Sequence, residues 1–535
     1  MNSTGTRKWW ALGALALATL TVGLDSTVLS VALPTLASAL HASESDLQWF
    51  SSGYLLALAA AMLPMGLLGD RIGRKKILLA SLLLFGVGSA ACAYAPTAGA
   101  FIAVRFALGL AGAGIVVMNL SALTLLFTKE ERPRAVGIWA AANFLSLPIG
   151  PILGGWLLTN YWWGWVFLMN VPVAFIGLLA ALLLVPDSRA PERPGLDPVG
   201  IFASTAGLVG VTYGLIEAGR NGWTDTIALT TMIAGVVVLV GFFLWEYLLG
   251  KRPGGQPLVD LTLFRSASFT WGVILAGIAG MAMIGVLFTL PQYFQGILGA
   301  DAMGSGVRLV PLIAGIVLGA VPADRIARLI GAKITVALGF ALLAAGMLIG
   351  STTVVGSDGS FLIMWEVVVG LGLGMTFATS ASAALAEISQ ERSGVASAVM
   401  QALQKMGGPL GTAILGSVLS SVYLSQLSLS RLPEAVARIV RQSLFGGLAV
   451  AAKFHSPALL RMVRGAFVNG MDVSVVVAAG IAAAGILLAL AFMPAKVAQK
   501  AGGGKAVKAA TVSPADTSVV DVAHRETGVA RRSRT

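Results

Sequence analysis

The chain has 535 residues, of which 57% are hydrophobic and only 11% are charged, and its formal net charge is +12. A soluble protein carries roughly 25% charged residues because its surface must face water, so this composition excludes a series of water-soluble domains. A single cysteine, Cys92, excludes an intramolecular disulfide framework. The composition therefore predicts an integral membrane protein.

Long apolar runs follow one another along nearly the whole chain. A transmembrane helix needs about 20 mostly apolar residues, and by that criterion the chain holds about fourteen spans. They begin near Trp9, Gln48, Ile77, Ala98, Ala135, Trp165, Val199, Thr226, Ser268, Gly306, Lys333, Phe361, Gly394 and Val473. We therefore predict an all-α polytopic membrane protein.

Basic residues cluster in every second connection between the spans. They follow the second, fourth, sixth, eighth and tenth spans, while the intervening short connections hold almost none. Because basic connections stay in the cytoplasm, this alternation predicts a protein of the cytoplasmic (inner) membrane with both termini inside. The excess of positive charge is thus a topology signal, and we expect no nucleic acid partner.

Two segments depart from the pattern of short connections. Residues 425–470 are expected outside but are basic, so we predict one or two amphipathic helices at the outer interface. Residues 495–535 are rich in Ala, Gly, Lys and Arg and are predicted to form a disordered cytoplasmic tail. Gly504-Lys505 in that tail lacks the Ser or Thr of a phosphate-binding loop, so no nucleotide cofactor is expected.

An internal repeat divides the chain. Asp70-Arg71-Ile72-Gly73-Arg74 follows the second span, and Asp324-Arg325-Ile326-Ala327-Arg328 follows the tenth. Two parallel six-helix bundles separated by a two-helix insert would give this spacing. The predicted division is a cytoplasmic N-terminus (1–8), a first bundle (9–186), an inserted pair (187–250), a second bundle (251–494) and the tail (495–535).

Four motifs together resemble those of a known family. Gly66–Lys76 is similar to the signature loop of the major facilitator superfamily, and Leu24–Pro34 resembles the first-span motif of its fourteen-spanner drug:proton antiporter branch. Gly150–Gly155 resembles the fifth-span antiporter motif, and Arg105 with Gly109 resembles the fourth-span motif. The resemblance implies the major facilitator fold, with two six-helix bundles plus two inserted helices, and fourteen transmembrane helices in all.

Charged residues inside spans are the most informative site candidates, since each costs about 2.5–3.5 kcal/mol to insert. Asp25 lies past the midpoint of the first span, and Arg105 lies shortly inside the outer end of the fourth. We expect both to face one cavity in the outer half, and the resemblance implies a proton-binding role for Asp25. The alternatives are a permanently paired Asp25 and an Arg105 that reaches the outer headgroups.

Two further sets of residues have roles that the resemblance implies. A cytoplasmic gating latch is expected from Gly66, Asp70, Arg71, Gly73, Arg74, Asp324, Arg325 and Arg328, with simple topology anchoring as the alternative. A kinked, closely packed helix is predicted from Gly150, Pro151, Gly154 and Gly155, because Pro removes a hydrogen bond and Gly permits backbone contact. In the family, the second element marks exporters that work by antiport.

Polar side chains within the spans are candidates for the substrate cavity or for contacts between helices. Those predicted to line the cavity are Asn119, Asn143, Phe144, Gln292, Tyr293, Gln401 and Lys405. Lys405 would repel cations or pair with a carboxylate. Glu217, Glu366 and Glu387 lie near span ends, so solvation at the membrane interface is expected for them.

These features favour a proton-coupled antiporter that exports amphiphilic drugs or antibiotics by alternating access. The expected partners are a small-molecule substrate, protons and the lipid bilayer, with no obligate protein partner. One alternative is export of a metabolite, an amino acid or a lipid on the same fold, and another is a membrane sensor that does not transport. An enzyme is not expected, because the sequence offers no nucleophile–base pair and no metal-ligand cluster; His41, His455 and His524 are scattered.

Overall fold

A computed structural model describes residues 3–128, 131–187, 197–252, 255, 257–259, 261–388, 393–430 and 432–494. Within these residues the regular elements are all helices, and thirteen of them are long and apolar enough to cross a membrane. The helix at the place of the predicted fifth span, α5 (Arg132–Asn160), has 29 residues and packs along α1 (Ser3–Ala39). The predicted all-α polytopic fold is confirmed.

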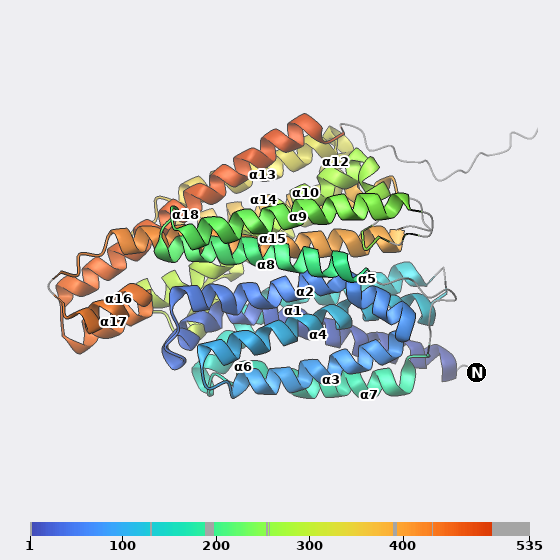
Figure 1. Cartoon of the computed structure of the whole chain (residues 1–535), viewed down its shortest axis with the longest axis horizontal. Coiled ribbons are helices and arrows are strands. Elements are labelled where there is room, and N and C mark those ends of the chain that lie inside the picture. Colours follow the sequence, from blue (N-terminus) through green and yellow to red (C-terminus); the bar gives the residue numbers. More distant parts are fainter. Residues whose placement is uncertain are drawn as a thin grey trace, which may run out of the picture. The chain divides into compact units, whose positions relative to one another are not determined.

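The first bundle surrounds its own hydrophobic core, and Figure 1 shows it in blue and teal. Besides α1 and α5 it contains α2 (Glu44–Ile72), α3 (Arg74–Ala93), α4 (Ala98–Leu126), α6 (Trp165–Leu168) and α7 (Asn170–Leu184). Its main packing pairs are α1 with α5, α2 with α4, and α3 with both α4 and α7.

The second bundle repeats this packing around a separate core. Its helices are α10 (Ala267–Gln292), extended by the π-helix η2 (Tyr293–Ile297), then α11 (Ala302–Arg308), α12 (Val310–Ile330), α13 (Ala332–Gly350), α14 (Gly359–Ala386), α15 (Ser393–Ser425) and α18 (Pro457–Phe492). Here α10 packs with α15, α12 with α14, and α13 with both α14 and α18, in the same chain order as in the first bundle. The repeat suggested by two short motifs is thus a repeat of the whole helix arrangement.

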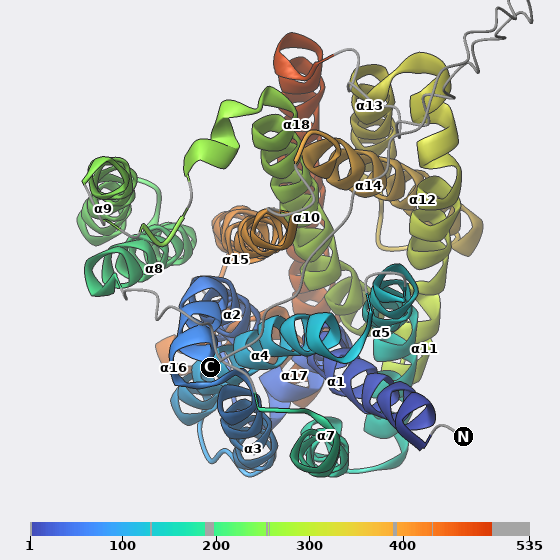
Figure 2. The ribbon, with the colours of Figure 1, turned by 90° about the vertical axis from the view of Figure 1, so that its right-hand side faces the viewer.

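Two helices stand between the bundles in the sequence and beside them in space. α8 (Pro198–Asn221) and α9 (Thr226–Lys251) pack on each other, and α8 also contacts α15 and α2 (Figure 2). Gly214 and Gly235 allow the backbones of α8 and α9 to approach, since a Cβ at Gly214 would lie 2.7 Å from Ala228 O. A short 3-10 helix, η1 (Leu261–Arg265), precedes α10.

Helix boundaries follow local sequence signals. Ser43 caps α2 in a capping box with Asp46, and side chains of Thr97, Asp197, Asp225, Ser266, Asp301, Asp358 and Ser456 cap α4, α8, α9, α10, α11, α14 and α18. Gly73 ends α2 with φ 130° and Gly331 ends α12 with φ 88°, conformations that other residues rarely adopt. These caps satisfy backbone groups that a membrane would otherwise leave unpaired.

The basic segment 425–470 contains two short helices, α16 (Glu434–Gln442) and α17 (Leu444–Lys453), which pack on each other. The last long helix then begins at Pro457, earlier than the predicted start near Val473, and runs for 36 residues. Figure 1 shows the start of α1 and the end of α18 at one end of the bundles, and α16 and α17 at the other. We call the end that carries the α1–α2 and α3–α4 connections the predicted outer end.

The two bundles meet along α2 with α15, α5 with α11, and α1 with α10. Gln295 in η2 donates its Nε2–H to Val31 O of α1 at 2.9 Å, and Ser52 of α2 contacts Pro409 O of α15 at 3.5 Å. Thr159 of α5 bonds to Asp301 before α11 at 3.3 Å. Because Val31, Thr159 and Asp301 lie toward the predicted outer end of their helices, these contacts close that end.

Candidate functional site

Asp25 and Arg105 form a buried ion pair. Nη1 of Arg105 on α4 lies 2.5 Å from Oδ2 of Asp25 on α1, and the exposed fractions of the two residues are 0% and 2%. A buried ion pair is stable only when further hydrogen bonds satisfy both groups. The surroundings of the pair therefore determine whether it can persist.

Two other helices, α2 and α7, contribute to this cluster. Nδ2 of Asn170, the first residue of α7, donates to Asp25 Oδ1 at 3.2 Å. Nε of Arg105 donates to the carbonyl of Phe50 on α2 at 3.1 Å, and its guanidinium lies 4.3 Å from the ring centroid of Tyr54. Tyr54 in turn donates its hydroxyl to Val22 O of α1 at 3.1 Å. The ion pair thus ties together α1, α2, α4 and α7.

Asp25 and Arg105 are expected from the sequence to face a common cavity in the outer half, and the structure places them differently. The structure brings them together, but inside the first bundle and without access to solvent. The reason is that carbonyl, amide and aromatic groups of the bundle replace water around both charges. Nη2 of Arg105 and Oδ1 of Asn170 still lack a hydrogen-bond partner within the described residues.

The fifth-span motif has two faces. A Cβ at Gly150 would collide with the side chain of Thr27 on α1, and one at Gly154 would lie 2.6 Å from Cγ1 of Val28. On the other face, a Cβ at Gly155 would lie 2.6 Å from Ala302 O of α11. In the reverse direction, a Cβ at Gly306 of α11 would collide with Pro151 O of α5. The glycines therefore bring α5 close to α1 within the first bundle on one face and into backbone contact with α11 of the second bundle on the other.

The first gating motif lies at the break between α2 and α3. Asp70 and Arg74 form an ion pair at 2.9 Å across the break, while Arg71 is exposed. Gly66 and Gly69 face α4, where a Cβ on Gly66 would lie 3.5 Å from Val117 Cγ1. The positive φ of Gly73 lets the chain turn so that Arg74 begins the next helix beside Asp70.

The second copy of the motif is not placed as the first is. Asp324, Arg325 and Arg328 all lie within α12, which continues to Ile330 before Gly331 ends it. Ala327 stands where the first copy has Gly73, and alanine favours the helix instead of a positive φ. Asp324 consequently accepts a hydrogen bond from Ser382 of α14 at 3.0 Å rather than forming a bridge across a helix break.

Another ion pair lies at the end opposite the predicted outer end. Lys8 Nζ lies 2.6 Å from Glu131 Oε1 and 2.7 Å from Oε2, which joins the start of α1 to the N-cap of α5. The hydrogen bond from Lys8 lowers the pKa of the Glu131 carboxyl below its ordinary value of 4.5. Lys8 was not among the residues for which a role is predicted.

The predicted cavity residues separate into different environments. Asn119 is buried and donates to Leu15 O at 3.0 Å and Thr19 Oγ1 at 2.7 Å, so it joins α4 to α1. Gln292 is buried at the junction of the bundles, and Tyr293 donates its hydroxyl to Val354 O at 2.9 Å. The side chains of Asn143 and Phe144 lie outside the described residues.

Lys405 and Gln401 differ from these buried groups. The side chain of Lys405 is exposed and that of Gln401 is half-buried, although both lie within the long helix α15. Lys405 shares a helix face with Gly408, where a Cβ would lie 2.9 Å from Leu55 of α2 and 3.5 Å from Ile284 of α10. This places Lys405 on the side of α15 that faces the other bundle.

Glu366 contradicts the expectation of solvation at the interface. It is only 1% exposed on α14, and its Oε2 lacks a partner within the described residues. Glu387, by contrast, is exposed and accepts hydrogen bonds from Ser266 at 2.7 Å and Ser268 at 2.9 Å. Glu217 is half-buried and bonds to Asn221 at 2.5 Å.

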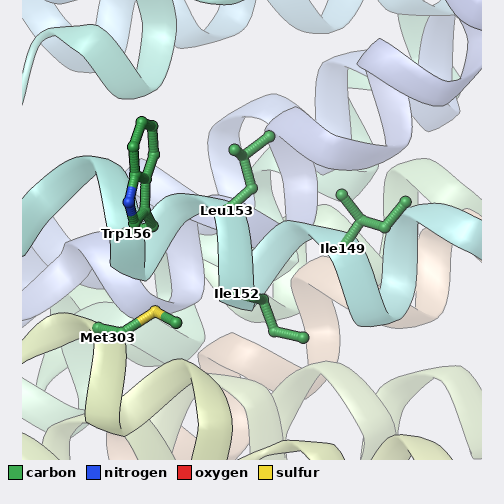
Figure 3. A pocket seen from close by; sticks show the side chains of 5 residues that line it. All are labelled: Ile149, Ile152, Leu153, Trp156 and Met303. Carbon is green, nitrogen blue, oxygen red and sulfur yellow. The ribbon is translucent and has the colours of Figure 1, made fainter.

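A cavity of ≈ 350 Å³ lies beside the seam between α5 and α11 (Figure 3). Ile149, Ile152, Leu153 and Trp156 line it from α5, and Met303 lines it from α11. All five side chains are apolar, and 43% of Trp156 is exposed. The cavity lacks the convergent polar groups that would orient a ligand.

Sequence reasoning missed three residues around the ion pair and the seam. Asn170 is a lone amide in the apolar run that begins at Trp165, and such an isolated polar residue is a usable signal. Tyr54 and Glu44 gave no comparable signal, because a tyrosine in a span and an acid at a helix start have many ordinary roles.

Comparison with known proteins decides the family. The profile described as Major Facilitator Superfamily matches residues 15–412. The chain belongs to this superfamily. The match confirms the resemblance inferred from the four motifs, and identifies the two bundles as the halves of a major facilitator transporter.

Relatives within the superfamily include exporters of antibiotics and other drugs. The tetracenomycin C resistance and export protein of Streptomyces glaucescens is 32% identical over 496 residues, covering 90% of this chain and 91% of that protein. The multidrug efflux pump LfrA of Mycolicibacterium smegmatis is 31% identical over 486 residues, covering 89% and 94%. The methyl viologen resistance protein SmvA of Salmonella typhimurium is 30% identical over 474 residues, covering 86% and 93%.

A solved structure shows the same fold. A bacterial homologue of the human lysosomal transporter Spinster, in an inward-facing and unoccupied conformation, superposes with a TM-score of 0.65 at 16% identity. The superposition covers 91% of this chain and 98% of that chain. The protein is therefore a multi-pass membrane transporter of the major facilitator fold, related in sequence to drug-resistance exporters.

Proposed function

We propose that the protein is a proton-coupled antiporter that exports amphiphilic drugs or antibiotics across the cytoplasmic membrane. Both termini lie in the cytoplasm, and Asp25 is the group that exchanges the proton. The observation that carries the proposal is the ion pair between Asp25 and Arg105, which is buried in a bundle of a transporter and linked to four of its helices.

A proton on Asp25 would remove one charge of this pair. Arg105 would then lie among carbonyl and aromatic groups without a counter-charge, a state that costs several kcal/mol unless the helices move or water enters. Protonation therefore gives the bundle two arrangements of different stability, which is what coupling to an ion gradient requires.

A chain of direct contacts leads from Asp25 to the second bundle. Thr27 and Val28 follow Asp25 on α1 and receive Gly150 and Gly154 of α5. The opposite face of α5 meets Ala302 at the start of α11 through Gly155. Glycine has no side chain, so the backbones of these helices are in close contact. A shift of α1 is therefore transmitted through α5 to the contact between α5 and α11, where the two bundles meet.

These contacts support a cycle of alternating access. With Asp25 ionised and paired, the seam at the predicted outer end is closed, as in this structure. A proton from outside would break the pair, favour opening of that end and release the substrate. Loss of the proton to the cytoplasm would restore the pair and prepare the next export step.

The relatives support the class of substrate. Their names include export of and resistance to tetracenomycin C, and resistance to methyl viologen. Lys405 is an exposed cation on the side of α15 that faces the other bundle, and it would weaken binding of strongly cationic cargo. We propose amphiphilic drugs and antibiotics as the main substrates.

The test is transport in inverted membrane vesicles that are energised to an acidic interior. Addition of a substrate from a panel of dyes and antibiotics should dissipate part of the pH gradient, and the substrate should accumulate inside. The Asp25→Asn variant should lose both responses, because its amide cannot exchange a proton.

Glu434→Gln is the matched control, since Glu434 is an exposed carboxyl on α16 paired with Arg441. It should transport as the unmodified protein does. Coupled transport that persists in Asp25→Asn would refute the role of Asp25. A panel with no substrate-dependent proton flux in the unmodified protein would refute the antiport mechanism.

A further inference from the structure

Glu44 is a buried acid at the junction of the two bundles. It lies in the first turn of α2, and only 6% of it is exposed. Nε2 of Gln292, on α10 in the second bundle, donates to Glu44 Oε1 at 3.3 Å. Asp46, and not Glu44, completes the capping box of α2 with Ser43. The Glu44 carboxyl is therefore free of the usual helix-capping role.

The groups around Glu44 are neutral. No Lys, Arg or His forms an ion pair with Glu44 within the described part of the chain. In the second bundle, Tyr423 on α15 is a buried neutral phenol that donates its hydroxyl to Val440 O at 2.8 Å. His41, in the preceding connection, is exposed to solvent, and Asp46 on α2 is half-buried. An ionised carboxylate is costly in such a place.

Two buried acceptor atoms near Glu44 have no donor among the described residues. They are Oε1 of Gln292 and Oε1 of Gln48, which lies one turn further along α2. Gln292 is 0% exposed and Gln48 is 1% exposed, so water does not readily supply these bonds. A carboxylate offers no donor, whereas a carboxylic acid offers one O–H. A proton on Glu44 would therefore supply a donor for one of these two acceptors.

We propose that Glu44 is a second proton-binding site, which holds the predicted outer end closed while its proton is bound. In the closed state the neutral acid and the amide of Gln292 join α2 to α10. When the bundles separate at this end, Glu44 meets water and releases its proton. The inference rests on the alternating access of the proposed function, but not on the role of Asp25.

The direction of the pH effect follows from proton linkage. The closed state binds the extra proton, so acid favours closure and alkaline solution favours opening at the predicted outer end. One such group changes the ratio of open to closed protein by up to about tenfold per pH unit. Glu44→Gln keeps the size and the hydrogen bonding of the neutral acid but cannot ionise, so it should remain closed across the pH range.

The experiment measures the separation of the bundles in the full-length protein in lipid nanodiscs. Spin labels on Gly99→Cys at the start of α4 and Gly356→Cys in the α13–α14 connection report this distance by pulsed electron paramagnetic resonance. Both positions have open space for a side chain. Cys92 is buried and should stay unlabelled.

In the unmodified background the long-distance population should grow from pH 5 to pH 9, and in Glu44→Gln it should not. Glu434→Gln is the control and should respond as the unmodified background does. Gln292→Met is a second variant, in which loss of the amide should shift the response to lower pH. Size-exclusion chromatography checks that each variant is folded.

An unchanged response in Glu44→Gln, or a distance that ignores pH in the Asp25→Asn background, overturns the inference. Asp25→Asn separates it from the proposed function, because this variant should lose coupled transport and keep the distance response. Opening that grows towards acid, persists in Glu44→Gln and disappears in Asp25→Asn would assign the pH response to Asp25 alone and overturn the inference.

Discussion

Replacing Arg105 by methionine tests whether the buried ion pair is a strongly stabilising element as well as a switch. Methionine retains an unbranched side chain of similar length, so that the main loss is the guanidinium and its contacts. These contacts are the ion pair with Asp25, the hydrogen bond to Phe50 O and the contact with the ring of Tyr54.

The expected magnitude follows from these contacts. Removing one member of a buried ion pair costs about 3–5 kcal/mol, because the other charge is left uncompensated. A desolvated cation–π contact contributes about 2 kcal/mol. Since neighbouring contributions are not additive, we expect Arg105→Met to lower the free energy of unfolding by about 4–6 kcal/mol.

The double variant Asp25→Asn with Arg105→Met should be more stable than Arg105→Met alone. Asparagine needs no counter-charge, so we expect it to recover at least about 2 kcal/mol. The deficit of the single variant should also grow as the pH rises, because an unpaired Asp25 can be buried with its proton in acid but must be buried as an anion in alkaline solution.

Thermal and denaturant unfolding in detergent, measured across pH for both variants, checks these values. Arg441→Met is the control, since Arg441 forms an exposed pair with Glu434 that should contribute no more than about 1 kcal/mol. A single variant as stable as this control, or a double variant no better than the single one, would refute the reasoning.

Three further predictions concern helix breaks and contacts. Gly155→Ala should loosen the seam, because its Cβ would lie 2.6 Å from Ala302 O; spin-label distances should lengthen relative to Gly480→Ala, where the added Cβ meets open space. Gly73→Ala should lower the free energy of unfolding by about 1–3 kcal/mol in denaturant titrations, because φ is 130°. Glu131→Gln should lower the Tm equally at pH 8 and pH 6. The pKa of Glu131 is lowered, so its carboxylate stays ionised and bonded to Lys8 until the pH falls below 4.5. An effect on the Tm that vanishes by pH 6 would contradict this.

The fold could be predicted because the signals for it are local and redundant. Each span is a long apolar run, and each break is marked by a capping residue or a glycine such as Gly73. The boundary errors arise where hydropathy and helix propensity differ. The apolar stretch near Val473 predicts too late a start for the last helix, which begins at Pro457. Arg461 and Arg464 lower the hydropathy of the preceding residues, but arginine has a high helix propensity, so the helix continues through them.

The site was predictable only in part, because burial depends on partners from other helices. Asp25 and Arg105 stood out as charges in apolar runs, and the resemblance linked them. That they lie inside one bundle depends on Asn170, Tyr54 and the Phe50 carbonyl, which solvate them in place of water. Hydropathy cannot locate such partners, since a single amide or a backbone carbonyl hardly changes the mean of a window.

The two acids at the predicted outer end differ in the chemistry that burial imposes on them. Asp25 has a permanent cation and an amide beside it, so its closed environment suits the carboxylate. Glu44 has neutral amides and acceptor atoms without donors, so its closed environment suits the acid. A proton therefore acts in opposite directions at the two sites, weakening the first bundle's ion pair and strengthening the contact between the bundles. Such opposition would make opening depend on which acid the external proton reaches first, and it lets each acid be tested while the other is intact.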